Sequence, residues 1–152
     1  MTDDATFSPF RTWPNMKMPP LSKEEWISVL ILASNWMFVR VRELAVFALE
    51  KMATVTSFTK ICLGMDHSIP SWVIDGFVGL VEATTITNFE AYRIDRYARY
   101  AAYRLFRIRE LRITGKISSS RVVVEEIFKE DLNRLRSKEK MFSNKAAKIM
   151  GK

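Results

Sequence analysis

Residues 22–33 read Ser-Lys-Glu-Glu-Trp-Ile-Ser-Val-Leu-Ile-Leu-Ala, and this stretch indicates the fold class. Ser22 and Glu25 are three residues apart, a spacing at which the hydroxyl and the carboxylate can each accept a hydrogen bond from a free backbone N–H at a helix start. Trp26 and Leu30 then begin an apolar series at helical spacing. The stretch therefore predicts an amphipathic helix with one buried side.

Similar patterns extend over most of the chain. Its 152 residues include only five Gly and five Pro, while 48% are hydrophobic and 27% are charged. This composition disfavours a turn-rich β architecture. We predict an all-α fold, an antiparallel bundle of about five to six helices. Further helices are predicted at about 38–52, at 57–65, from Pro70, at 88–112 and at 122–135. The predicted core anchors are Trp26, Leu30, Trp36, Leu44, Ile61, Trp72 and Phe77.

The spacing of Pro, Gly and charged residues suggests four segments. Residues 1–20 hold four of the five prolines and are expected to form an irregular leader. Residues 21–112 are expected to form the main helical domain, and 113–136 a linker with one more helix. Residues 137–152 are rich in Lys and are predicted to be a frayed basic tail.

The longest predicted helix contains neither Gly nor Pro. Thr87 and Glu90 repeat the capping spacing, and residues 88–112 are predicted to form one continuous helix. In the preceding helix, Gly76 and Gly79 lower helix propensity. Close packing against a neighbouring helix is the predicted reason for both glycines.

The positive charge is concentrated in the C-terminal part of the chain. Residues 1–89 hold 7 Lys and Arg against 9 Asp and Glu, a net charge of −2, whereas residues 90–152 hold 17 against 8, a net charge of +9. A phosphate-rich or acidic partner would therefore meet the C-terminal part.

An ordered series of short motifs runs through residues 21–110. The motifs are LSKEEWISVL at 21–30, Ala33, Trp36, VRELA at 41–45, KICLG at 60–64, IPSW at 69–72, Gly76-Phe77, Leu80-Val81, Thr87 and Glu90-Ala91. In this order they resemble the helical C-terminal region of basidiomycete fungal BTB/POZ-domain proteins. The resemblance implies a BACK-like helical domain used in protein–protein association, with no catalytic residues to carry over. The α/β BTB core that the family has before this region is not in this sequence.

The residues that usually carry catalysis or bind metals are scarce. His67 is the only histidine and Cys62 the only cysteine, so no pair stands at metal-ligand spacing, and no Gly-rich phosphate loop is present. We expect no enzymatic activity, no cofactor and no metal site. Cys62 is interpreted as a small core residue, with a redox-sensitive thiol as the alternative. His67 is interpreted as a polar residue of the loop before Pro70, with a pH-responsive contact as the alternative.

An Arg/Tyr-rich stretch gives the candidate binding residues. Arg93, Arg96, Arg104 and Arg107 interleave with Tyr92, Tyr97, Tyr100 and Tyr103. One interpretation is a helix with a buried Tyr/Leu/Ile side and a solvated Arg side. The others are contacts of the four arginines with an acidic protein or with nucleic acid phosphates.

These observations favour a non-enzymatic adaptor that binds other proteins, with self-association left open. The alternative is a nucleic-acid-binding protein that uses the Arg/Tyr-rich helix and the basic tail. A truncated gene product without an independent role is a third hypothesis. We expect no membrane attachment, because the longest apolar run is far shorter than a membrane span of roughly 20 residues. The acidic start and single cysteine suggest an intracellular protein, cytoplasmic or nuclear.

Overall fold

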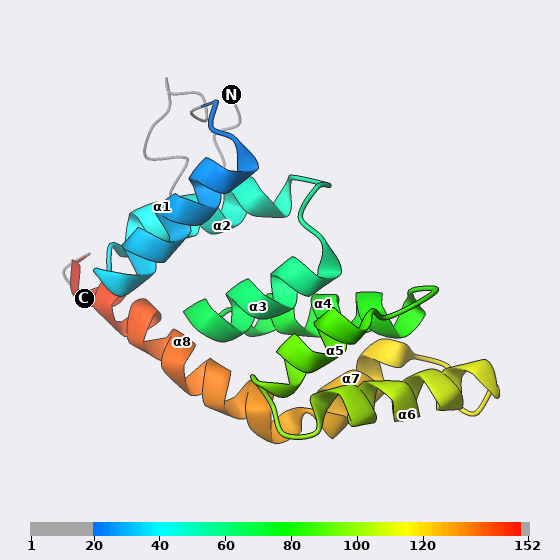
Figure 1. Ribbon diagram of the computed structural model, residues 1–152. Coiled ribbons are helices and arrows are strands. Elements are labelled where there is room, and N and C mark those ends of the chain that lie inside the picture. Colours follow the sequence, from blue (N-terminus) through cyan, green and yellow to red (C-terminus); the bar gives the residue numbers. More distant parts are fainter. Residues whose placement is uncertain (1–19, 150–152) are drawn as a thin grey trace. The chain divides into compact units, whose positions relative to one another are not determined.

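The computed structural model describes residues 20–149, which form eight α-helices and no strand (Figure 1). The all-α prediction is confirmed, but the predicted number of helices is too low. The helices are α1 (Lys23–Asn35), α2 (Val39–Glu50), α3 (Ser57–His67), α4 (Pro70–Glu82), α5 (Asn88–Asp95), α6 (Ala101–Ile113), α7 (Ser120–Ile127) and α8 (Lys129–Ile149). The predicted leader, apart from Pro20, and the last three residues of the predicted tail lie outside the described residues.

The chain divides into two compact units. The first contains α1, α2 and the residues from Phe142 onward, and the second comprises residues 56–141. The boundary falls inside the stretch 21–112, which the sequence led us to expect as one domain. The expected frayed tail is helical as far as Ile149. Its Lys, Glu, Ala and Met residues favour helix, and no Gly or Pro interrupts them before Gly151.

The predicted capping box starts α1. The Ser22 Oγ accepts a hydrogen bond from the Glu25 N–H at 3.1 Å, and the Glu25 Oε1 accepts one from the Ser22 N–H at 2.8 Å. These bonds satisfy backbone donors that have no partner inside the helix. α1 packs against α2, and Trp26, Leu30 and Leu44 are buried in this unit.

Trp36 is not a core residue. Its side chain is 67% exposed, so the prediction of a buried anchor at this position is wrong. Each helix residue turns by about 100°, which places position 36 well away from the face that Trp26 and Leu30 define. α1 also ends just before it: Met37 adopts a left-handed φ of 57°, and the Phe38 N–H donates to the Ala33 carbonyl at 2.8 Å. This is the Schellman pattern of a helix end.

In the second unit α3 and α4 approach each other closely at glycine positions. A Cβ atom on Gly76 would lie 2.5 Å from the Ile61 Cγ1 and 2.6 Å from the Ser57 carbonyl oxygen. One on Gly64 would lie 2.6 Å from the Val73 Cγ2. Real Cβ atoms are not found so close to other atoms, so these positions require glycine. Close packing at Gly76, which the sequence predicted, is confirmed.

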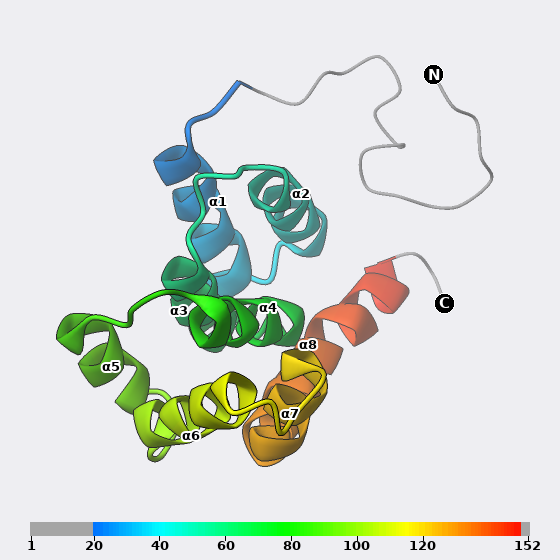
Figure 2. The same ribbon diagram turned by 90° about the vertical axis from the view of Figure 1, so that its right-hand side faces the viewer.

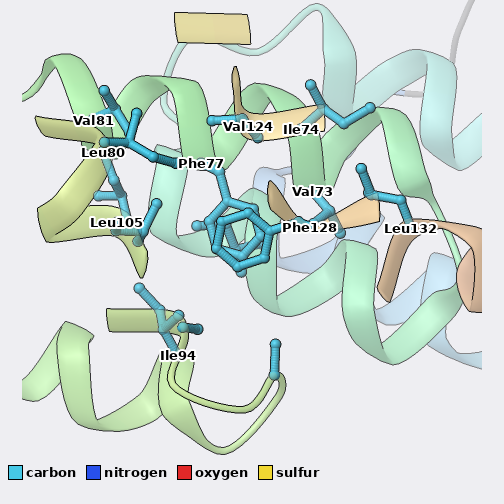
Figure 3. Close-up of a cluster of buried hydrophobic side chains, with 14 of the residues drawn as sticks. Val73, Ile74, Phe77, Leu80, Val81, Ile94, Leu105, Val124, Phe128 and Leu132 are labelled. Carbon is cyan, nitrogen blue, oxygen red and sulfur yellow. The ribbon is translucent and has the colours of Figure 1, made fainter. Parts of the chain in front are cut away.

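The core of the second unit draws side chains from α3 through α8 (Figure 3). At its centre the Phe77 and Phe128 rings stack, with centroids 4.2 Å apart and planes 17° from parallel. Stacking of this kind adds to the free energy gained by burying two aromatic side chains. The predicted anchors Ile61, Trp72 and Phe77 are all buried in this unit.

The segment predicted as one helix at 88–112 consists of two helices. α5 ends at Asp95 and α6 begins at Ala101, so the helices are separate elements in both views (Figures 1 and 2). The Asp95 Oδ1 accepts the Ala102 N–H at 2.8 Å and thereby caps the start of α6. Tyr100 has a left-handed φ of 55°, which breaks the helix without Gly or Pro.

The predicted helix at 122–135 is also divided. α7 begins at Ser120, where the Ser119 hydroxyl accepts the Val122 N–H at 3.3 Å. The break comes at Phe128, whose ring is fully buried against Phe77, and α8 begins at the next residue. Stacking in the core therefore coincides with the break, a position that the sequence pattern alone does not reveal.

Candidate interaction surface

Helix α6 is apolar on two opposite sides. Its inner side is buried in the core of the second unit and consists of Ala101, Ala102, Leu105 and Ile108. Its other side, together with the residue before the helix, carries four large apolar side chains exposed to solvent: Tyr100 (64%), Tyr103 (66%), Phe106 (49%) and Ile113 (75%). These four residues, spaced three or seven apart along one side, are named the outer α6 stripe. A surface helix normally has polar residues on this side.

Arg104 holds α6 in place from the inner side. Its guanidinium lies 4.3 Å from the centre of the Phe128 ring, and its Nη1 donates to the Ile127 carbonyl at 3.1 Å and to the Asp131 Oδ2 at 3.2 Å. Its Nη2 donates to the Arg99 carbonyl at 2.5 Å. The side chain is only 23% exposed. These contacts stabilise the fold, so the Arg104 guanidinium is not available to bind a ligand.

Arg109 joins α6 to the end of α4. Its Nη1 donates to the carbonyls of Leu80 and Ala83 at 2.9 and 2.7 Å, and its Nη2 donates to the Thr84 carbonyl at 3.1 Å. Carbonyls at a helix C-terminus have no partner inside the helix, so a guanidinium is well suited to them. The sequence reasoning did not single out this residue.

The other three candidate arginines lie at or near the surface in different settings. Arg93 on α5 is half-buried, with its guanidinium 5.9 and 5.6 Å from the Phe58 and Phe89 ring centres. Arg96 is exposed at the end of α5. Arg107 is exposed on the outer side of α6 and pairs with Glu110 at 3.0 Å. The four arginines therefore do not form one continuous face.

The tyrosines are also divided. Tyr92, Tyr100 and Tyr103 are exposed, so the interpretation that assigns tyrosines to the buried side is wrong for these three. Tyr97 is half-buried, and its hydroxyl donates to the Asp66 Oδ2 at 3.1 Å. Burial raises the pKa of Tyr97 to about 12, and the neighbouring Cys62 and Asp66 add to the shift.

Cys62 and His67 differ from their predicted positions. Cys62 is half-buried on α3 beside Tyr97, and burial raises the pKa of its thiol. Cys62 was interpreted as a small core residue, and its side chain is only partly covered. His67 is the last residue of α3, whereas a loop position was predicted. The helix continues past position 65 because Ser68, in the left-handed region, closes it.

Two polar residues that line a hollow in the second unit are engaged in the fold. A shallow hollow bordered by Glu82 and Arg112 includes Ser119 and Arg121. However, Ser119 caps α7, and Arg121 pairs with Asp75 at 2.9 Å. Within residues 20–149, no group of three or more His, Cys, Asp or Glu side chains is placed to hold a metal ion. No helix in that range is long and apolar enough to cross a membrane.

No protein-family model, curated protein or solved structure matches this chain. Its function must therefore be inferred from its own residues. The sequence analysis did not single out Phe106 and Ile113. Among the residues of α6, Ile113 has the most exposed aliphatic side chain and Phe106 the most exposed phenyl ring. The signal that could have found them is the recurrence of apolar residues three or seven positions apart, on the side away from Leu105 and Ile108.

Proposed function

We propose that the chain is a non-enzymatic protein-interaction module and that the outer α6 stripe is its docking face. The observation that carries this proposal is the exposure of four large apolar side chains on a helix whose opposite side is already packed in the core. Large apolar side chains gathered on one exposed side of a helix commonly mark a protein contact. Aromatic side chains and arginine are also the residues enriched in the centres of interfaces.

The sequence resemblance supports the same function. The motifs in residues 21–110 resemble the helical region of fungal BTB/POZ proteins, in which such helices serve protein association. An adaptor of this kind acts by docking partners. The resembling motifs end at Glu90-Ala91, before α6, so the choice of α6 as the docking face rests on its own exposed residues. We further propose that the protein acts inside the cell, because its only cysteine cannot form an internal disulfide.

The proposal can be tested with a photo-crosslinking amino acid in the full-length chain. Benzoylphenylalanine replaces Tyr103 in one protein and Val122 in another, because Val122 on α7 is equally exposed at 66% but lies outside the stripe. Both proteins are irradiated in extract of the cells that express the chain, with and without nuclease treatment. We expect a discrete polypeptide adduct from position 103 and none from position 122.

Two further results would decide against this function. Equal adducts from both positions would mean that the contact is unspecific. Crosslinking that disappears when nucleic acid is removed would favour the competing function, nucleic-acid binding, for which the exposed Arg99 and Tyr100 are the supporting observation. Substitution of Phe106 by Ser should lower adduct formation from position 103 by about tenfold if the stripe is the docking face.

A further inference from the structure

Positive charge borders the outer α6 stripe. The Arg99 guanidinium lies 5.1 Å from the centre of the Tyr100 ring, and Arg107 is exposed on the same side of α6 as Tyr103, one turn further along. Arg96 is also exposed just before this region. The stripe therefore combines apolar contact area with guanidinium groups at its edges.

The acidic groups nearby are already engaged. Glu110, which lies on the outer side of α6, pairs with Arg107 at 3.0 Å. The Asp95 carboxylate accepts the Ala102 N–H and caps the helix. With Arg96, Arg99 and Arg107 against Asp95 and Glu110, the exposed surface around the stripe keeps an excess of positive charge. A partner that covers it would have to supply carboxylates.

The length and shape of the stripe favour a helix as the partner. Tyr100 to Ile113 is 13 residue steps, or about 20 Å of helix at 1.5 Å per residue. A second helix of about four turns, packed along α6, could place an apolar row against all four side chains of the stripe. Its flanking acidic residues would then meet Arg99 and Arg107 in charge-assisted hydrogen bonds.

A second copy of the chain is a poorer occupant. In a two-fold symmetric contact the same surface patch meets itself. Both faces would then carry the same excess of arginine, and like charges across an interface oppose binding. Nucleic acid would satisfy the arginines, but phosphates would leave Phe106 and Ile113 without an apolar contact.

We propose that the outer α6 stripe binds an acidic amphipathic helix of another protein. This inference rests on the proposed interaction function and specifies the partner. The apolar row of the partner covers the exposed Tyr, Phe and Ile side chains, and its carboxylates pair with the flanking arginines. Burial of apolar surface would provide the affinity, and charge complementarity would select the partner.

Four fluorescent probes test this inference by anisotropy with the full chain at about 0.15 M salt. The first is a peptide of about 18 residues with Leu at helical spacing and Glu on both sides of the Leu row. The second has Lys in place of every Glu. The third has the composition of the first in an order that disperses the Leu residues. The fourth is an oligothymidylate of about 18 nucleotides.

The first peptide should bind at least about tenfold more tightly than the other three probes. Removing charge from the stripe with Arg99→Gln and Arg107→Gln should weaken its binding by about tenfold. Lys138→Gln with Lys140→Gln removes the same charge from exposed positions on α8 and should change binding less than about twofold. Unchanged circular dichroism would show that each variant is folded.

Several outcomes would overturn the inference. Equal binding of the dispersed acidic peptide would mean that charge alone is recognised, and tighter binding of the oligonucleotide would assign the surface to nucleic acid. Equal loss in the arginine and lysine variants would also exclude a defined site. If no peptide binds while position 103 still crosslinks to a protein, the proposed function stands and the acidic helix is the wrong partner.

Discussion

The two sides of α6 use similar residue types in different ways. Arg104 on the inner side contacts Phe128 and Asp131, which belong to the core and to α8. Arg107, three residues later on the outer side, forms an ion pair with Glu110 of the same helix. Leu105 is fully buried, while the adjacent Phe106 is half exposed. Residue type therefore does not tell which apolar or basic groups of this helix stabilise the fold and which remain available to a partner.

The largest difference in stability should be between variants of the two adjacent apolar residues, Leu105 and Phe106. Leu105→Ala should lower the free energy of unfolding by about 2–5 kcal/mol, because it leaves a cavity in the core. Phe106→Ala should lower it by less than about 1 kcal/mol, since much of that ring is already in water. Chemical unfolding followed by circular dichroism measures both. Similar losses would show that the outer side also stabilises the fold.

The two arginines should differ somewhat less. Arg104→Ala removes hydrogen bonds to two carbonyls and leaves the largely buried Asp131 without this partner, so we expect a loss of about 2–4 kcal/mol. Arg107→Ala breaks an exposed ion pair and should cost less than about 0.5 kcal/mol. For binding of the acidic peptide we expect the opposite order, in which the Arg107 variant loses more affinity than the Arg104 variant. An Arg107 variant that unfolds as easily as the Arg104 variant would contradict the assignment of sides.

A smaller effect is expected where α6 meets the end of α4. Arg109→Ala should cost about 1–2 kcal/mol, because the carbonyls of Leu80, Ala83 and Thr84 each lose one hydrogen bond from the guanidinium. Arg112 is exposed, and its replacement by Ala should stay within about 0.5 kcal/mol. Thermal unfolding of the two variants side by side would measure the difference. Equal unfolding temperatures of the two variants would mean that water replaces the Arg109 guanidinium with no loss of stability.

A further effect should appear only at high pH. In the folded chain the pKa of Tyr97 is raised to about 12, whereas an unfolded Tyr has a pKa of about 10. The folded state therefore binds this proton more tightly. The resulting stabilisation is fully present below pH 10 and is lost as the pH rises towards about 12. Across this pH window the free energy of unfolding should fall more in the unmodified chain than in Tyr97→Phe. If the free energies of the two proteins fall in parallel with pH, the raised pKa of Tyr97 is refuted.

Local signals in the sequence predicted the helix starts well. The Ser22–Glu25 and Thr87–Glu90 pairs form the capping boxes expected of them, because each involves only neighbouring residues. The all-α class follows from the same local preferences. The close approach at Gly76 was also predicted, since a glycine that lowers helix propensity inside an apolar helical pattern commonly lies where a neighbouring backbone comes close.

Features that depend on distant residues could not be predicted. The break after Asp95 needs Tyr100 in a left-handed conformation that no propensity suggests. Arg104 and Arg107 look alike in sequence, and only the position of Phe128 separates them. For Trp36, the end of α1 at the preceding residue decides its exposure. The candidate site was therefore located to the correct stretch of chain, but its apolar half, Phe106 and Ile113, was missed.

Helices α3 and α4 meet at Gly64 and Gly76 and are joined by Ser68 and Ile69 alone. This short connection keeps the entropy of loop closure small. Contacts between elements that are adjacent in sequence also form rapidly. We therefore expect α3 and α4 to dock early during folding, and their backbone amides to be among the last in the second unit to exchange with heavy water.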